Sequence, residues 1–122
     1  MNTLNTGDRI AITKGPNITH YGIYAGNNTV IDNSNAKGGV NERPLCEFAG
    51  GRKIRRIQLT AKFPPHEVVA RARQQIGKPY GWFSQNCEHF VNEVQLDNPK
   101  STQAVIGGSI IAIVFWRLFV KR

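Results

Sequence analysis

A cysteine at the start of a predicted amphipathic helix is the feature that most constrains this chain. Positions 86–91 read Asn-Cys-Glu-His-Phe-Val, and apolar residues continue at helical spacing through Val91 and Val94. Asn86 is a residue type that commonly caps a helix, so Cys87 is expected in the first turn. There the unpaired backbone N–H groups and the positive end of the helix dipole favour a thiolate over a thiol. The thiolate is the reactive form of cysteine, so the segment predicts a nucleophile that needs a base.

The candidate base, His20, opens a predicted β-hairpin that turns at residues 26–28 and returns to Asp32. With a three-residue loop at the turn, Gly22 faces Asp32, and His20 lies on the same face of the hairpin as Gly22. His20 and Asp32 then form a diagonal pair whose backbones lie roughly 7–8 Å apart, within reach of their side chains. A two-residue loop would place them on opposite faces, so the pairing depends on the odd loop.

Other titratable residues fit this chemistry less well. His89 would lie about 200° around the helix from Cys87, so it is not expected to act as its base. His66 falls in the first turn of another predicted helix and is expected to be exposed, whereas Cys46 is expected to be a small core residue. A Cys-x-His pair offers no set of four ligands, so neither a metal nor another cofactor is expected.

The residues around these positions resemble the lecithin retinol acyltransferase family. The resemblance covers roughly residues 7–96 and rests on the Asn-Cys-Glu-His-Phe-Val block, the His-Tyr-Gly-Ile-Tyr-Ala-Gly hairpin that begins at His20, and the lead-in Gly-Asp-Arg-Ile. The small phospholipase/acyltransferase branch is the most similar. The family is a circular permutation of NlpC-type papain-like peptidases, which explains why the histidine precedes the cysteine. Animal members typically carry a second histidine where this chain has Asp32.

The resemblance implies acyl transfer from a glycerophospholipid ester through a Cys87 thioester. His20 would act as the general base and Asp32 would orient it, since papain-like enzymes accept several polar residues in that role. Two other function classes stay open. One is a papain-like cysteine peptidase or amidase, and the other is a non-enzymatic, tail-anchored membrane-remodelling protein. The acyl donor and acceptor, the organelle and the oligomeric state stay open as well.

The pattern along the chain predicts an α+β domain over residues 1–98, with an antiparallel sheet packed against helices. Strands are expected at 8–13, in the hairpin and at 53–59, and the segment 40–48 reads as a strand followed by a short helical turn. A helix is expected to begin at Pro64-Pro65. Its expected apolar stripe consists of Val68, Val69, Ala72 and Ile76.

The C-terminal segment gives a second signal. After a linker at residues 99–103, residues 104–116 carry no charge. A helix over residues 104–120 would be about 25 Å long, a little less than the ~30 Å hydrocarbon core of a bilayer. Because this segment follows a complete domain, it predicts a membrane anchor that leaves the catalytic domain on the cytosolic side. The alternative is an ordinary buried helix.

Charge and cysteine content agree with that interpretation. Sixteen basic and eight acidic residues give a formal net charge of +8, which favours an anionic membrane surface as a partner; no nucleic acid is expected. Two cysteines are too few for a disulfide framework, and a catalytic thiol implies a reducing compartment. Residues 1–6 are polar and do not resemble a signal peptide.

Overall fold

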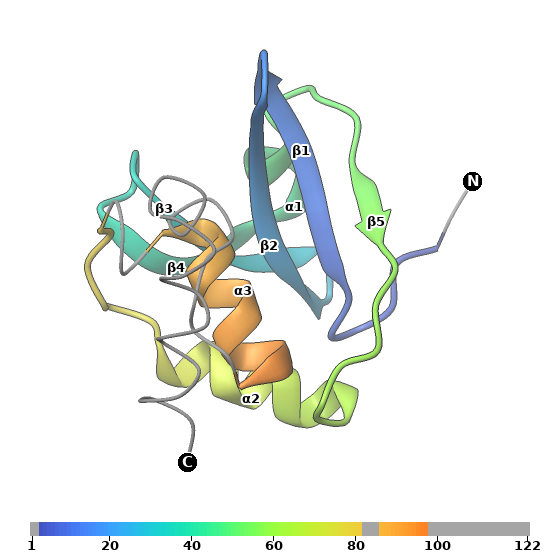
Figure 1. Ribbon diagram of the computed structural model, residues 1–122. Coiled ribbons are helices and arrows are strands. Elements are labelled where there is room, and N and C mark those ends of the chain that lie inside the picture. The colour runs from blue at the N-terminus through green and yellow to red at the C-terminus, as the bar shows by residue number, and fades with distance from the viewer. Residues whose placement is uncertain (1–2, 82–85, 98–122) are drawn as a thin grey trace, which may run out of the picture.

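A five-stranded antiparallel sheet with helices on both faces forms the domain (Figure 1). The computed structural model describes residues 3–81 and 86–97. Its elements are β1 (Arg9–Gly15), β2 (Ile18–Gly26), β3 (Thr29–Ser34), β4 (Gly39–Pro44), α1 (Leu45–Ala49), β5 (Arg55–Ile57), α2 (Pro65–Gln74) and α3 (Cys87–Leu96). The predicted α+β class is confirmed. The permuted relation to papain-like peptidases stays a prediction, and the predicted linker and C-terminal helix lie outside the described residues.

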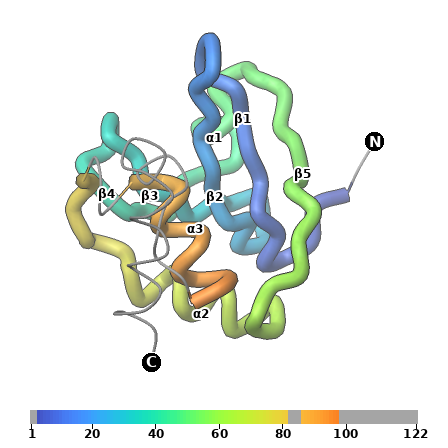
Figure 2. The backbone as a smooth tube through the Cα atoms, viewed as in Figure 1, coloured from blue at the N-terminus to red at the C-terminus, as the bar shows by residue number. Residues whose placement is uncertain are grey.

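The strand order in the sheet is β4-β3-β2-β1-β5. Four consecutive strands form a meander, and β5 returns to lie along the free edge of β1 (Figure 2). The sequence predicted a strand over 53–59 for this return, but only Arg55–Ile57 pair with β1. β2 therefore lies between β1 and β3, and β3 lies between β2 and β4. His20 is fixed by its pairing with Ile12 of β1, and Asp32 by its pairing with Asn41 of β4.

Each face of the sheet has its own apolar core. Helices α2 and α3 cover one face, and α1 packs against the other, as the ribbon shows (Figure 1). The first core consists of Ile23, Ala25, Ile31, Val40, Val68, Val69, Ala72, Phe90, Val91 and Val94. The second consists of Ile10, Ile12, Val30 and Phe48. Neighbouring residues of β3 thus enter opposite cores, as the period of two in a strand requires.

Helix α2 begins at Pro65, as the sequence predicted, because proline suits the first helical turn, where its missing N–H is not needed. It buries Val68, Val69 and Ala72. The prediction that Ile76 would continue this stripe is wrong. The helix ends at Gln74, and Ile76 lies in the turn that follows, with 44% of its surface exposed.

Helix α1 corrects the prediction for Cys46, which is exposed rather than part of the core. The helix has only five residues and directs Phe48 and Ala49 inward. One turn and a half of helix buries one side only, and Cys46 lies on the side that faces solvent. Gly50 ends the helix in the left-handed conformation that glycine adopts without strain.

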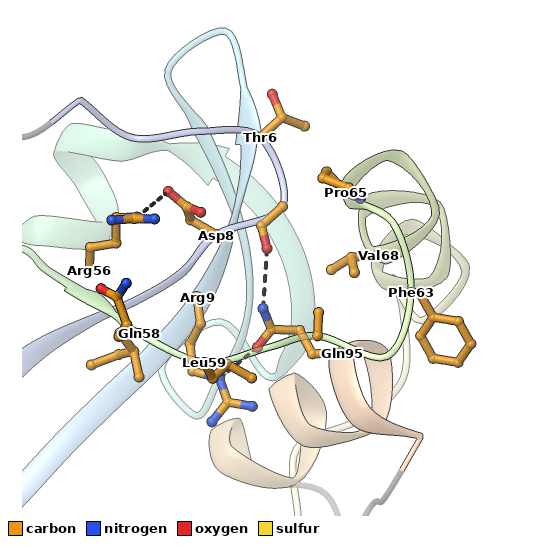
Figure 3. A pocket seen from close by; sticks show the side chains of 13 residues that line it. Thr6, Asp8, Arg9, Arg56, Gln58, Leu59, Phe63, Pro65, Val68 and Gln95 are labelled. Carbon is orange, nitrogen blue, oxygen red and sulfur yellow. Dashed lines mark hydrogen bonds and ion pairs between the residues drawn. The ribbon is translucent and has the colours of Figure 1, made fainter.

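A buried arginine joins α3 to the sheet. Arg9 on β1 donates from Nε to Gln95 Oε1 at 2.7 Å and from Nη2 to Asn92 Oδ1 at 2.9 Å. Gln95 in turn donates to the carbonyl oxygen of Gly7 at 3.2 Å (Figure 3). These contacts are made from the last two turns of α3, whereas Phe90 and Val91 pack in the first core. Together they fix the direction in which the N-terminal end of the helix points.

Gly22 offers a direct test of the packing around the hairpin. A Cβ at this position would lie 2.7 Å from Val30 Cγ1 and 2.9 Å from Phe48 Cε1. Gly22→Ala should therefore lower the free energy of unfolding by about 1–3 kcal/mol, because the core would be overpacked. Urea denaturation of the full-length protein measures this difference.

Gly15→Ala is the matched control for that variant. Gly15 is also a strand glycine, and a methyl group there would have Ile18 Cδ1 as its nearest neighbour, at an ordinary contact distance of 3.9 Å. It should leave the unfolding midpoint nearly unchanged. Equal destabilisation by both substitutions would contradict the close packing of Gly22 against the second core.

Candidate active site

His20 lies in the middle layer of the domain, on the face of β2 that α1 covers. It pairs with Ile12 across the β1–β2 ladder, and its ring centroid lies 5.4 Å from that of Phe48. Only 7% of the residue is exposed. The sheet and the Phe48 ring therefore hold the imidazole in one place and leave little of it in contact with water.

Asp32 reaches the same face through a β-bulge. Asn27 and Asn28 form a two-residue turn, both with left-handed φ values, of 51° and 60°. The ladder pairs Gly26 with Thr29 and then shifts register, so that Tyr24 pairs with Val30. The predicted three-residue loop is wrong, because the turn has two residues and the extra residue lies in β2 as a bulge. The shared face of His20 and Asp32 is confirmed.

The shared face brings the two side chains into direct contact. His20 Nε2 lies 2.6 Å from Asp32 Oδ2. Asp32 is completely buried, so this contact is not diluted by solvent. The geometry is that of a carboxylate that orients an imidazole, the arrangement in which one ring nitrogen is fixed and the other is left for a second partner.

Arg43 also belongs to this cluster, although the sequence alone did not predict it. From β4 its Nε donates to Asp32 Oδ1 at 3.1 Å, and its Nη2 donates to Asp32 Oδ2 at 2.6 Å. The signal for it lay in the register, because Asp32 pairs with Asn41 and Arg43 is two residues further along the same face. That register was not readable from a segment predicted only as a mixed strand and helical turn.

Cys87 approaches the histidine from the helical layer. Asn86 caps α3 as predicted, its Oδ1 accepting the His89 backbone N–H at 2.8 Å. Cys87 is 7% exposed, and its Sγ lies 3.9 Å from the carbonyl oxygen of Thr19, the residue before His20. The N-terminal end of α3 thus meets β2 at the position of the histidine, and the structure brings together the three residues that the sequence proposed.

The electrostatics of the histidine reflect both partners. Burial of the ring lowers its pKa, but hydrogen bonds and charge interactions with Asp32 and Cys87 together outweigh burial, so the pKa of His20 is raised. The pKa values of two tyrosines near Cys87 are also raised. The pKa of Tyr80 is raised by burial and then by the charge of Cys87, and the pKa of Tyr21 is raised by burial and then by Glu88.

The other two histidines lie on helices. His66 is exposed on α2, as predicted, and His89 belongs to the first turn of α3, where its backbone N–H meets the cap. Within residues 3–81 and 86–97, no three His, Cys, Asp or Glu side chains are close enough together to hold a metal ion.

Two cavities open elsewhere on the domain. The smaller one, about 260 Å³, lies between the start of β1, the chain after β5, and α2, and the Arg9–Gln95 and Asp8–Arg56 contacts border it (Figure 3). The larger one, about 1010 Å³, has an apolar lining of Leu4, Tyr24, Leu45 and Ile54. Lys53, Arg55 and Arg56 border it. Neither cavity is lined by the Cys87–His20–Asp32 cluster.

The part of the chain that the structure describes includes no helix long and apolar enough to cross a bilayer. The segment predicted as an anchor, residues 104–120, lies outside the described residues.

Comparisons with known proteins show the family of this chain. Phospholipase A and acyltransferase 3 of Mus musculus is 29% identical over 120 aligned positions, which cover 80% of this chain and 74% of the mouse protein. Lecithin retinol acyltransferase of Rattus norvegicus is 29% identical over 138 aligned positions, covering 85% of this chain and 59% of the rat protein. The sequence model of the family described as lecithin retinol acyltransferase matches residues 2–100, and this chain therefore belongs to that family.

Proposed function

We propose that this protein is a membrane-anchored thiol acyltransferase and phospholipase A that acts on the acyl esters of glycerophospholipids. The observation that carries the proposal is the buried His20 ring, held by Asp32 on one side and adjacent to Cys87 at the start of α3 on the other. Membership in a family whose relatives are named for phospholipase A and acyltransferase activity supports the substrate class.

The first half-reaction forms an acyl-enzyme. Since His20 Nε2 is engaged with Asp32, Nδ1 is the ring nitrogen left to take the proton of the Cys87 thiol. The sulfur attacks the ester carbonyl, and backbone N–H groups in the first turn of α3, that of Cys87 among them, stabilise the oxyanion. The C–O bond then breaks, His20 returns its proton to the departing alcohol, and a lysophospholipid leaves.

The second half-reaction decides between the two activities. His20 removes a proton from the acceptor, which attacks the thioester and releases Cys87. Water as the acceptor gives a free fatty acid and hence phospholipase A activity, whereas an amine or a lysophospholipid gives acyl transfer. Both outcomes use the same three side chains, so the nature of the acceptor and not the triad sets the product.

Anchoring at a membrane is the other part of the proposal. The uncharged segment within residues 104–120 would hold the catalytic domain at a bilayer on its cytosolic side. On the folded domain, the larger cavity combines an apolar lining with the basic residues Lys53, Arg55 and Arg56, a combination that suits a surface of anionic lipids.

Trapping of the acyl-enzyme tests the chemistry. Full-length protein incubated with a phospholipid mixture should gain the mass of a fatty-acyl group in intact-mass spectra, and hydroxylamine should remove it. Cys87→Ala should abolish the increment and at least 99% of turnover, because no nucleophile remains.

Cys46→Ala is the matched control, since Cys46 is the exposed second thiol. It should keep both the increment and the turnover. Persistence of lipid turnover in Cys87→Ala would refute the thioester mechanism. Cleavage of amides in preference to esters would instead favour the peptidase or amidase alternative.

The pH dependence follows from the raised pKa of His20. The imidazole must be neutral to accept the thiol proton, so turnover should rise with pH along an acid limb centred above the ordinary histidine value of about 6.5. This limb belongs to the coupled Cys87–His20 pair. Asp32→Asn removes the contact that most raises the pKa of His20, so the limb should move to lower pH while the maximal rate falls. An unmoved limb in this variant would contradict the role of Asp32.

Removal of residues 104–122 tests the anchor. The truncated protein should retain turnover of dispersed short-chain esters, because Cys87, His20 and Asp32 all precede the deletion. It should lose at least 10-fold in turnover on bilayers, since the tail supplies local concentration at the interface. The test measures sedimentation of the protein with vesicles, in parallel with its turnover of dispersed esters and of bilayer lipids.

The truncated protein should keep weak binding to anionic vesicles that disappears with salt, because exposed charges are screened over ~10 Å at 0.1 M. Lys53→Glu/Arg55→Glu should abolish this residual binding. The control Lys14→Glu/Lys78→Glu makes the same change in net charge at exposed positions away from the larger cavity and should retain it. Aggregation or unfolding of the truncated protein would show that the segment is a core helix.

A further inference from the structure

Arg43 makes a two-point contact with the carboxylate that orients His20. Its Nε and Nη2 reach Oδ1 and Oδ2 of Asp32 at 3.1 Å and 2.6 Å, and its side chain is only 12% exposed. The two residues lie on neighbouring strands, in a diagonal relation set by the pairing of Asp32 with Asn41. A planar guanidinium that meets both oxygens of a carboxylate fixes its orientation as well as its charge.

The shared oxygen gives this contact a chemical consequence. Oδ2 of Asp32 accepts a hydrogen bond from Arg43 Nη2 and lies 2.6 Å from His20 Nε2. An arginine is always protonated in proteins, so it can only donate, and Asp32 beside it serves as an acceptor. The hydrogen between His20 and Asp32 must then belong to Nε2, which leaves the lone pair of Nδ1 for the thiol of Cys87.

Arg43 is itself held in position by a second set of contacts. Its guanidinium carbon lies 5.8 Å from the centroid of the Phe48 ring, the ring that also packs against His20. Its Nη1 lies 3.6 Å from Glu47 Oε2, and Glu47 pairs with Lys37 at 2.6 Å at the surface. The ring of Phe48 thus packs against both Arg43 and His20.

We propose that Arg43 is a positioning residue that acts through Asp32 to hold His20 in the tautomer that accepts the proton of Cys87. This inference rests on the proposed function, since it assigns a role within the same site. It predicts that loss of Arg43 changes the titration of His20 and lowers turnover, even where the fold and substrate binding are kept.

The experiment uses the full-length variants Arg43→Gln, Arg43→Lys and Arg73→Gln. Arg73 is the matched control, because it makes an equivalent two-point contact with Glu42 of β4, at 3.1 Å to each oxygen, on an exposed surface. Arg43→Gln should lower kcat by at least 10-fold with little change in KM, whereas Arg73→Gln should stay within 2-fold. Arg43→Lys should recover part of the rate, because it keeps the charge and loses the two-point geometry.

The titration of His20 gives a readout that a purely structural role would not move. Among the described residues, the titratable groups around the ring are Asp32 from β3, Cys87 from α3 and, behind Asp32, Arg43 from β4. Of the two ion pairs that Asp32 makes with described residues, Arg43→Gln removes the one with Arg43 and keeps the one with His20. The positive charge near the ring is then gone and the carboxylate remains, so the pKa of His20 should rise. Histidine side-chain NMR measured against pH gives this value, and Arg73→Gln should leave it unchanged.

A double-mutant cycle with Asp32→Asn completes the test. If Arg43 acts through Asp32, Asp32→Asn/Arg43→Gln should be no slower than Asp32→Asn alone. Multiplicative losses, or an Arg43→Gln variant with an unchanged rate and an unchanged His20 pKa, would overturn the inference. Should Arg43→Gln fail to fold, Arg43→Lys in the same cycle decides in its place. Full turnover in Cys87→Ala and Asp32→Asn would instead refute the proposed function itself.

Discussion

One extra residue in β2 determines the chemistry that this sheet can offer. The Asn27–Asn28 turn alone would join β2 and β3 in the register that places Asp32 on the face covered by α2 and α3. The bulge between Tyr24 and Gly26 shifts the pairing by one residue, and Asp32 emerges on the face of His20. Without that shift the carboxylate would point into an apolar core, where an ion without a partner is strongly disfavoured.

The same constraint explains the polar cluster that follows from it. Asp32 is fully buried, accepts from Arg43 and lies 2.6 Å from His20 Nε2. A buried ion pair adds little to stability compared with apolar residues of the same size, whereas removing one partner is costly, about 3–5 kcal/mol. Such a cluster in the second core is therefore better explained by what it does to His20 than by its contribution to folding.

The site also depends on how two layers are joined. The sheet supplies the histidine and its carboxylate, and α3 supplies the thiol, so the position of Cys87 relative to His20 is set by the docking of the helix. That docking combines the apolar contacts of Phe90, Val91 and Val94 with the buried Arg9 on β1. The helix is thereby held along its length, and its N-terminal turn, with the cap at Asn86, is presented to β2.

Local sequence determined the parts of this protein whose structure depends on nearby residues. The cap at Asn86, the start of α2 at Pro65 and the hairpin around Asn27–Asn28 follow from residue types and spacings within a few positions. The face shared by His20 and Asp32 was predicted correctly from a three-residue loop, but the structure reaches it through a two-residue turn and a bulge in β2. Family resemblance then supplied the expected chemistry of Cys87.

Tertiary structure decided what depends on residues far apart in the chain. The exposure of Cys46 and Ile76 was predicted wrongly, because burial depends on which side of a short helix or turn meets the rest of the molecule. Arg43 was not predicted at all, since its contact with Asp32 depends on the β3–β4 register and on Phe48, which lies in a third element. Periodicity shows which face of an element is apolar, but only the packing of the elements determines which charged side chains meet within it.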